Sequence, residues 1–465
     1  MVRLRGANRA CCVFAGGRAA RPPPHALDTW QHECYILAPL PLWREERSRN
    51  VDEQTTNAPQ RSAAPTATWR RPYYTILAGQ AVSQVGSSAV QFALIWYLAQ
   101  ETASPAAMGL AGLAAFLPGA LLSPAAGIVA DRHNRKRVCI AADLAAGIMA
   151  TAFALAMGAW GISAVAVIAL LAARAAATSF QAPAMQAMVP QIVPAESLVE
   201  AGGMSQAISS ASYVLGPVVG GLLFAAFPLP VILVTDLVGA LVAAIALGVV
   251  PVSDHRAEGE RPKLHPVREL RDGLAVFWED RVLTQVIVSF LVFMVFFMPL
   301  SSFYPLMTSD FFGLGAFEGS LVEMSWALGM LVAGIAVAKA NIKDEVRASF
   351  LATVALGATC IASGLLPQSF GGWVAFAVLC GAMGATATCY DVPIVAYMQK
   401  SIAPEKLGRA FSAFQIVSMV STPIGLAIAS PVAEALGVNA WFGISGVAIA
   451  LLGVVMLALQ GRARR

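Results

Sequence analysis

The chain has 465 residues, of which 57% are hydrophobic and 12% are charged, and its mean hydropathy is +0.67. Soluble domains carry roughly 25% charged residues, so this composition argues against an ordinary soluble protein. The formal net charge of +4 is small and gives no reason to expect nucleic-acid binding.

Residues 1–71 differ in composition from the rest of the chain. They are rich in Arg, Pro, Ser, Thr and Ala, and they contain no apolar stretch of roughly 18 residues. We expect this tail to be disordered and cytoplasmic. No Met occurs between Met1 and Met108, and Val51 opens a plausible short leader. Because valine codons can start translation in bacteria, we also expect the mature chain to begin near Val51.

Twelve apolar stretches follow from Pro72 onward. Each is long enough, at about 1.5 Å per residue, to cross roughly 30 Å of hydrocarbon as a helix. The expected spans are 73–99, 105–130, 138–160, 162–188, 201–227, 230–251, 282–308, 314–339, 347–366, 371–399, 406–434 and 438–460. The sequence therefore predicts an all-α membrane protein with twelve transmembrane helices.

Lys and Arg are concentrated in alternate loops. The loops expected outside lie near 100–104, 161, 228, 309–313, 367–370 and 435–437 and contain neither residue. One loop expected inside, 189–200, also lacks both. Loops rich in Lys and Arg stay in the cytoplasm. We therefore expect a multi-pass protein of the cell membrane with both termini in the cytoplasm.

A loop over 252–281 divides the spans into two halves of six, 72–251 and 282–465. Its second part, 267–278, predicts an amphipathic surface helix. The halves also resemble each other, because Pro183 and Pro194 have the same spacing as Pro393 and Pro404.

The repeated copies lie about 207–210 residues apart. A parallel repeat of two six-helix halves is a recurrent transporter design.

The loop between the second and third expected spans places five charges within seven residues. It reads Gly127-x-x-Ala-Asp131-Arg132-x-x-Arg135-Lys136. This pattern resembles the corresponding loop of the major facilitator superfamily, with Asn134 in place of the usual Gly. Asn tolerates a left-handed backbone, so we expect a left-handed turn there. The resemblance implies a cytoplasmic latch, in which Asp131 and Arg132 contact neighbouring helix ends.

The fifth expected span carries a pattern of small residues. It consists of Gly203, Ser212, Gly216, Pro217, Gly220 and Gly221. The pattern resembles the motif of the drug-exporting branch of the superfamily, with Ser212 replacing one Gly. Ordinary close packing of helices is the alternative explanation.

Several further stretches are similar to the macrolide efflux family. They are Gly79-Gln80-Ala-Val-Ser83, Ile95-Trp96-Tyr97-Leu98, Pro183-Ala-Met-Gln-Ala, Tyr304-Pro305-Leu306 and Leu407-Gly408-Arg409-x-Phe411-Ser412. The resemblance implies the two-half superfamily fold and export of amphiphilic, macrolide-like drugs by proton antiport with alternating access. A siderophore or other small metabolite is the alternative cargo. A third hypothesis is a membrane receptor or assembly partner that has this fold but does not transport.

No pattern for nucleotide hydrolysis or for any other enzyme is present. The seven cysteines do not form the two closely spaced pairs that are typical of a metal site, so we predict neither a metal site nor a cofactor. We expect an ion gradient to supply the energy for transport and the protein to be a monomer. An ATP-binding partner protein is the alternative source of energy.

Ionisable residues inside membrane spans are the default functional candidates because burying a charge in hydrocarbon is costly. Those in the expected spans are Asp143, Arg174, Asp236, Glu323 and Asp391. We expect them to couple transport to protons. For Asp143, Asp236 and Glu323, snorkelling or helix capping is the alternative.

Polar faces on three spans predict a wet substrate cavity between the halves. The residues are Gln80, Gln84, Ser87 and Gln91 on the first span, Gln206 and Tyr213 on the fifth, and Gln415 on the eleventh. Hydrogen bonding between helices is the alternative. Aromatic residues offer an apolar wall for a large ligand: Phe92, Trp96, Phe297, Phe303 and Tyr304.

Overall fold

The computed structural model describes residues 69–161, 163–251, 266–340 and 342–463. Within these ranges the side chains of 124, 131, 158–160, 199, 266–270, 272, 405 and 461–463 are not described. The expectations for the tail up to residue 68, and for a start near Val51, lie outside the described residues. All described helices belong to one compact unit, 66–465.

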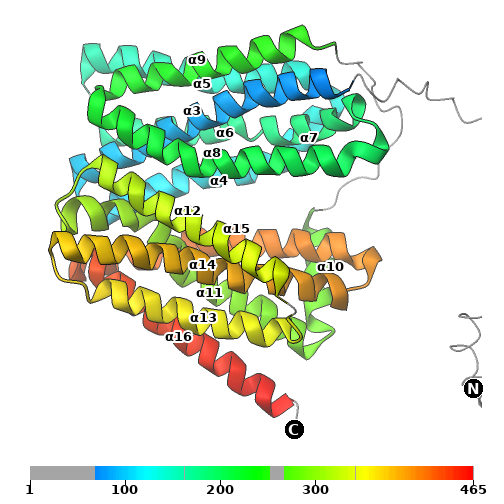
Figure 1. The fold of residues 1–465 in the computed structure, drawn as a ribbon, viewed down its shortest axis with the longest axis vertical. Coiled ribbons are helices and arrows are strands. Elements are labelled where there is room, and N and C mark those ends of the chain that lie inside the picture. The colour runs from blue at the N-terminus through cyan, green and yellow to red at the C-terminus, as the bar shows by residue number, and fades with distance from the viewer. Residues whose placement is uncertain (1–68, 162, 252–265, 341, 464–465) are drawn as a thin grey trace, which may run out of the picture. The chain divides into compact units, whose positions relative to one another are not determined.

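The first half of the chain forms one helix bundle, coloured blue to green in Figure 1. Its helices are α3 (Arg70–Thr102), α4 (Pro105–Arg132), α5 (Arg135–Trp160), α6 (Ala164–Thr178), α7 (Gln181–Ile192), the short 3₁₀ turn η4 (Ala195–Ser197), α8 (Leu198–Ala226) and α9 (Leu229–Val249).

The second half forms a second bundle, coloured from light green to red. Its helices are α10 (Pro266–Trp278), α11 (Arg281–Leu306), the π-helical turn η5 (Met307–Phe311), α12 (Ala316–Lys339), α13 (Glu345–Gly364), α14 (Phe370–Ser401), α15 (Pro404–Leu436) and α16 (Val438–Ala463).

Eleven helical segments of the described residues are long and apolar enough to cross a membrane. Helix α3 is the twelfth span, with 33 residues that pack against α8 and α9. Its hydropathy is lower because Arg70, Arg71 and a stripe of Gln and Ser side chains lie along it. The prediction of an all-α protein with twelve transmembrane helices is confirmed.

The fourth span is broken, although the sequence predicts one continuous helix over 162–188. Helix α6 ends at Thr178, and α7 begins at Gln181 after a turn. Pro183 lies in the first turn of α7, where it has no N–H to donate to the preceding turn. The missing hydrogen bond explains why the helix is interrupted just before this proline.

The two bundles repeat the same helix contacts. Helix α5 packs against α9 and α4 against α6, as α13 packs against α16 and α12 against α14. The repeat extends to helix capping. Asn134 accepts a hydrogen bond from the backbone N–H of Arg137 at 3.1 Å, and Asp344 accepts one from Arg347 at 3.1 Å.

The expected left-handed turn at Asn134 is wrong. Its φ is −63° and its ψ is 111°, which is an extended conformation, and its side chain caps α5. Asn is among the preferred residues for this capping position, so the residue is suited to the loop for a different reason.

The two bundles meet through α8 with α12 and through α4 with α15. Close contacts lie toward the ends that the charge pattern assigns to the outside. A Cβ atom at Gly319 would collide with the Trp96 ring, and one at Gly221 would lie 2.7 Å from Ser320 Cβ. In the same region, Ser104 Oγ and the backbone N–H of Ala106 both donate to Glu434 Oε2 at 3.3 Å. We call this last contact the outer clasp.

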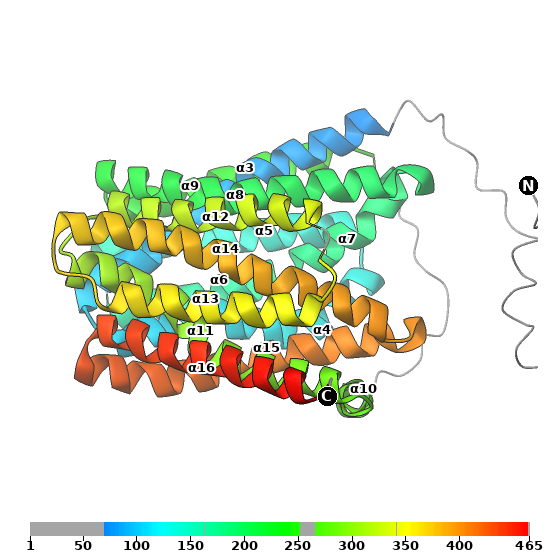
Figure 2. The ribbon, with the colours of Figure 1, turned by 60° about the horizontal axis from the view of Figure 1, so that its bottom comes forward.

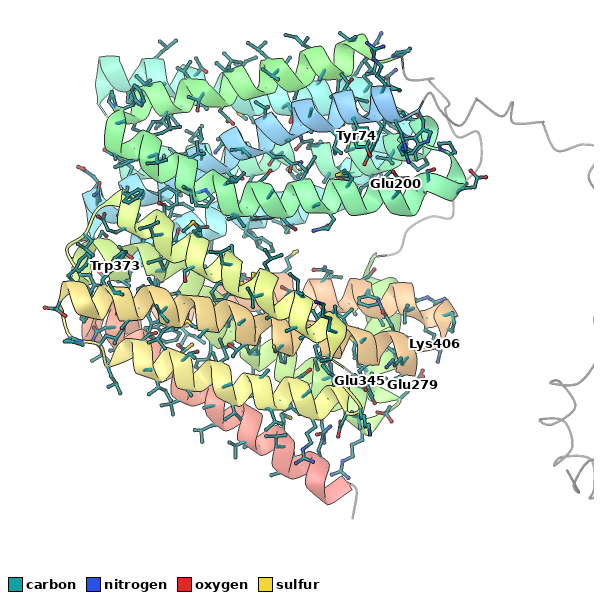
Figure 3. The ribbon with its side chains drawn as sticks, in the orientation of Figure 1. Tyr74, Glu200, Glu279, Glu345, Trp373 and Lys406 are labelled. Carbon is teal, nitrogen blue, oxygen red and sulfur yellow. The ribbon has the colours of Figure 1, made fainter. Side chains whose placement is uncertain are left out.

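Helix α10 covers the segment for which the sequence predicts an amphipathic helix. Figure 2 shows it at the end of the bundle, beside α15. Its Phe277 is fully buried, and Glu279, just beyond its end, receives two hydrogen bonds of 2.8 Å from Lys406 Nζ. Figure 3 places Glu279, Lys406 and Glu345 at the same end of the second half, opposite Trp373.

Candidate functional site

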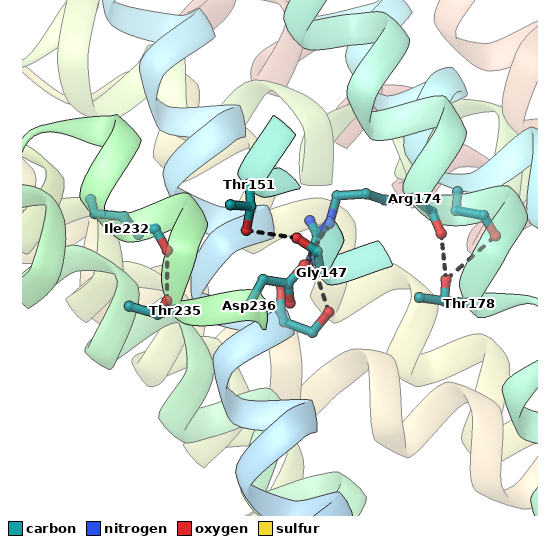
Figure 4. Close-up of polar contacts among 9 residues, drawn as sticks. Gly147, Thr151, Arg174, Thr178, Ile232, Thr235 and Asp236 are labelled. Carbon is teal, nitrogen blue, oxygen red and sulfur yellow. Dashed lines mark hydrogen bonds and ion pairs between the residues drawn. The ribbon is translucent and has the colours of Figure 1, made fainter. Parts of the chain in front are cut away.

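A buried ion pair joins two helices of the first half. Arg174 on α6 and Asp236 on α9 are only 5% and 4% exposed. Arg174 Nη2 lies 2.9 Å from Asp236 Oδ2, and its Nε donates to the same oxygen at 3.1 Å (Figure 4). Arg174 Nη2 also donates to Ser87 Oγ on α3 at 2.8 Å. Two opposite charges that contact each other inside the bundle offset part of the cost of removing each from water.

Asp143 on α5 lies in a second polar cluster of the same half. It is 5% exposed, and its Oδ2 accepts a hydrogen bond from Gln80 Nε2 at 3.1 Å. Gln181 Nε2, at the start of α7, donates to Gln80 Oε1 at 2.6 Å. These hydrogen bonds are made to amides, so Asp143 has no cationic partner among the described side chains.

The second half also contains an acid inside a membrane span, Glu323. It lies on α12, and its Oε2 accepts a hydrogen bond from Tyr304 Oη on α11 at 2.7 Å. No ion pair to Glu323 is found among the described residues. The first half therefore holds a neutralised pair, whereas Glu323 has only a neutral phenol as its partner.

A cavity of about 570 Å³ separates the two halves. It is lined by α3, α4 and α8 from the first half and by α11, α12 and α15 from the second. Tyr304 and Glu323 form part of its wall, together with Gln91, Tyr213 and Ser418. We call it the central cavity.

Two smaller cavities share lining residues with the central cavity. One, of about 330 Å³, lies in the first half and is lined by polar side chains that include Gln84, Ser87 and Arg174. The other, of about 150 Å³, lies in the second half and is lined mainly by aromatic and other apolar side chains. We call them the polar cavity and the aromatic cavity.

The predicted cavity residues divide into two groups. Gln84, Ser87, Gln91 and Tyr213 line the polar cavity. Gln80, Gln206 and Gln415 line none of the three cavities: Gln80 is buried in the Asp143 cluster, and the other two are exposed elsewhere. For Gln80 the structure thus agrees with the alternative of hydrogen bonding between helices.

The aromatic candidates divide in the same way. Phe92 and Tyr304 line the central cavity, and Phe297 lines the aromatic cavity. Trp96 and Phe303 are fully buried, so they are core residues.

The predicted acids also differ in their surroundings. Asp143 and Asp236 are buried and hydrogen-bonded in the bundle interior, which argues against snorkelling or capping at these two positions. Asp391 on α14 is exposed and lines none of the three cavities.

The charged loop between α4 and α5 contacts two helices of its own half. Arg135 Nη1 donates to the carbonyl oxygen of Ala187 on α7 at 3.1 Å. Lys136 Nζ donates to the carbonyl oxygens of Gly248 and Val250, at the end of α9, at 2.9 and 2.8 Å. Cations stabilise the carbonyl end of a helix. Arg132 is exposed, Gly127 faces open space, and the Asp131 side chain lies outside the described residues.

The small-residue pattern on α8 serves mainly for close packing. A Cβ atom at Gly216 would collide with Ser88 on α3, and one at Gly220 would lie 2.7 Å from the Ala89 carbonyl oxygen. Ser212 lines the polar cavity, Pro217 lines the central cavity, and Gly203 faces open space.

Three residues of these sites were not predicted from the sequence: Gln181, Trp326 and Glu434. Gln181 directly follows the break in the fourth span, where a polar residue can reach neighbouring helices. Glu434 is an isolated acid at the C-terminal end of a long apolar span, which is a usable signal. Trp326 carries no signal that separates it from a core residue.

Comparison with known proteins gives a consistent result. The Major Facilitator Superfamily matches residues 76–416. Macrolide efflux protein A of Streptococcus pyogenes is 35% identical over 395 residues, covering 83% of this chain and 95% of that protein. Multidrug efflux pump Tap of Mycobacterium bovis is 25% identical over 411 residues, covering 84% and 94%.

A solved structure shares the fold. It is a bacterial homologue of the iron transporter ferroportin in an inward-facing state, with a TM-score of 0.64 at 18% identity, covering 83% of this chain and 98% of that chain. With two repeated bundles of membrane-spanning helices and the family match over most of its length, the chain belongs to the Major Facilitator Superfamily of membrane transporters.

Proposed function

We propose that the chain is a secondary active exporter of amphiphilic drugs of the macrolide type, driven by proton antiport. The observation that carries this proposal is Glu323, an acid without a cationic partner that lines the cavity between two repeated bundles. The 35% identity to macrolide efflux protein A supports the drug class.

The cavities suit an amphiphilic cargo. Gln84, Ser87 and Gln91 provide hydrogen-bonding groups on the side of the first half. Phe297 and Trp326 provide apolar surface on the side of the second half. Ligand sites typically combine apolar walls with a few polar groups that fix orientation.

Proton coupling is assigned to Glu323 and Asp143. An acid inside a membrane bundle without a cation gains by binding a proton, because burial disfavours its charged form. Asp236 already has Arg174 as its partner. We therefore assign that pair to holding α6 and α9 in place rather than to proton transfer.

Alternating access would take the form of one bundle rocking against the other. The outer clasp and the contact of Trp96 with Gly319 would separate when the outer side opens. Lys400 pairs with Glu345, and Lys406 with Glu279, at the end that we assign to the cytoplasm together with both termini. The protein would work as a monomer in the cell membrane.

The test is accumulation of radiolabelled erythromycin in a susceptible bacterial host. Cells that express the chain should accumulate less drug than cells with an empty vector, and a protonophore should abolish the difference. Unchanged accumulation together with iron-dependent secretion of a catecholate would instead support a siderophore exporter. Efflux that survives the protonophore but stops on ATP depletion would support an ATP-binding partner.

A further inference from the structure

The aromatic cavity has a wall that is rich in aromatic side chains. Its wall contains Phe297, Tyr304, Trp326 and Phe442. The Phe297 and Trp326 rings lie with their centroids 5.7 Å apart and their planes inclined at 34°. Aromatic side chains thus surround a space of about 150 Å³ on several sides.

Glu323 adds a carboxyl group to this aromatic wall, and this group is negatively charged when it has released its proton. Glu323 and Tyr304 line both the aromatic cavity and the central cavity, so they lie where the two meet. Tyr304 Oη donates to one carboxylate oxygen, Oε2. No other side-chain hydrogen bond and no ion pair to this carboxylate is found in the part of the chain that the structure describes. Because Glu323 lines both cavities, its side chain borders space that a ligand can occupy.

We infer that the aromatic cavity and Glu323 together form a subsite for an alkylated ammonium group of the exported compound. The inference rests on the proposed function and names the part of the substrate that this site selects. Macrolide antibiotics carry such a group as a dimethylamino sugar, which is protonated at neutral pH.

The chemistry of the wall matches this group in two ways. Aromatic faces attract a cation through the electrons of the ring, and cages of aromatic side chains recognise methylated ammonium groups. The carboxylate supplies the charge-assisted partner that an N–H of the tertiary ammonium requires. A neutral apolar group would fill the same space but would leave the Glu323 carboxylate with Tyr304 alone and no cationic partner.

The polar cavity is lined by hydrogen-bonding side chains rather than by aromatic rings. This difference between the two cavities fixes the orientation of the substrate. Arg174 there is neutralised by Asp236, and Gln84, Ser87 and Gln91 present amides and a hydroxyl. These groups suit the hydroxyl-bearing parts of a macrolide. The ammonium group therefore points into the second half and the hydroxyl groups toward the first.

The test compares binding of a charged and a neutral probe to the full-length protein in lipid nanodiscs. The probes are erythromycin and a derivative whose dimethylamino group is converted to a neutral amide. Wild-type protein should bind the neutral derivative about tenfold more weakly, as expected for loss of one buried charge pair. Glu323→Gln should lose most of this preference and keep at most the roughly two- to fivefold part that the aromatic rings contribute. The Gln side chain keeps an acceptor for Tyr304, so the fold is preserved.

Two further variants sharpen the comparison. Glu318→Gln lies on the same helix outside all three cavities and should retain the wild-type preference. Trp326→Phe keeps an apolar wall but has a weaker cation–π contact, so affinity for erythromycin should fall about two- to fivefold while affinity for the neutral derivative is unchanged. A Glu323→Gln protein that keeps the full preference of about tenfold for erythromycin, or that binds neither probe, overturns the subsite.

A third probe separates this inference from the proposed function. If wild-type protein binds neither macrolide, the macrolide assignment fails. Binding of benzyltrimethylammonium that disappears in Glu323→Gln would still uphold the ammonium subsite. Binding of that probe that does not depend on Glu323, or no binding at all, would overturn it.

Discussion

Arg174 and Asp236 contact each other between α6 and α9, with Nη2 and Oδ2 2.9 Å apart in the interior of the first bundle. Both side chains are almost completely buried, and Ser87 on α3 accepts a further hydrogen bond from the same guanidinium. Three helices are therefore joined at one point by a group that carries no net charge.

Removing one partner of this pair should destabilise the protein. Arg174→Met or Asp236→Leu leaves a buried charge without compensation, which typically costs about 3–5 kcal/mol. The double variant removes both charges and should recover most of the loss. Thermal unfolding of the purified protein measures this, and equal melting temperatures for the wild type and both single variants would contradict it. Export by the double variant would show that the pair is structural.

Substitution of the unpaired acids should separate coupling from binding. Asp143→Asn keeps an acceptor for Gln80 and should retain erythromycin binding, but it should abolish substrate-driven proton movement in inverted vesicles, followed with a pH-sensitive dye. Glu323→Gln should abolish this signal as well. Asp391→Asn should retain it, because Asp391 is exposed and lines none of the three cavities. A normal signal in both of the first two variants would contradict the assignment.

Breaking the outer clasp should favour opening to the outside. Glu434→Ala removes the carboxylate that accepts from Ser104 and Ala106 at the start of α4. Such an interaction is worth about 0.3–1 kcal/mol, so the labelling rate of Ser301→Cys in the central cavity should rise about two- to fivefold. An impermeant maleimide on intact cells, in a background without native cysteines, measures the rate. Glu318→Gln is the control, and an unchanged rate in Glu434→Ala would count against the clasp.

Lys136 should be required for the stability of the first bundle at its inner end. Lys136→Met leaves the carbonyl groups of Gly248 and Val250 without their charged donor, which should cost about 1.5–3 kcal/mol. Lys136→Arg retains the charge and should recover part of it. Thermal unfolding again provides the measurement, and equal stability of all three proteins would contradict the contact.

Asp131→Asn should abolish export while the protein still reaches the membrane. Asp131 lies in the last turn of α4, and it is the one acid among the closely spaced cations of its loop. Removing it leaves the closely spaced cations to repel each other. Efflux assays with immunoblots of the membrane fraction test this, and normal efflux by the variant would refute the proposed latch.

The twelve spans could be predicted because each is a long apolar run, and the alternation of charge in the loops fixed their number. The break at Pro183 could also have been predicted, since a proline early in a helix lacks a donor to the turn before it. The contact of Arg174 with Asp236 could not be predicted in this way, because it depends on which helices pack together and on how far along each helix the two residues lie. The same holds for Gln80, which periodicity places on the cavity face but which Asp143 and Gln181 hold in the interior.

Sequence similarity between the halves predicted repeated architecture, and the caps at Asn134 and Asp344 follow it. The chemistry of the interior does not follow it. In the first bundle Asp236 has an arginine as its partner and Asp143 has an amide, whereas Glu323 in the second bundle has a phenol. No period in the sequence distinguishes these cases.

The pairing of Arg174 with Asp236 also has an electrical consequence. When one bundle rocks against the other, this pair moves no net charge through the membrane field. Each elementary charge that crosses 100 mV is worth about 2.3 kcal/mol. If a cationic drug leaves in exchange for one proton at Glu323, the two charges cancel, and the cycle draws on the pH difference alone. A neutral cargo exchanged for the same proton would draw on the membrane voltage as well.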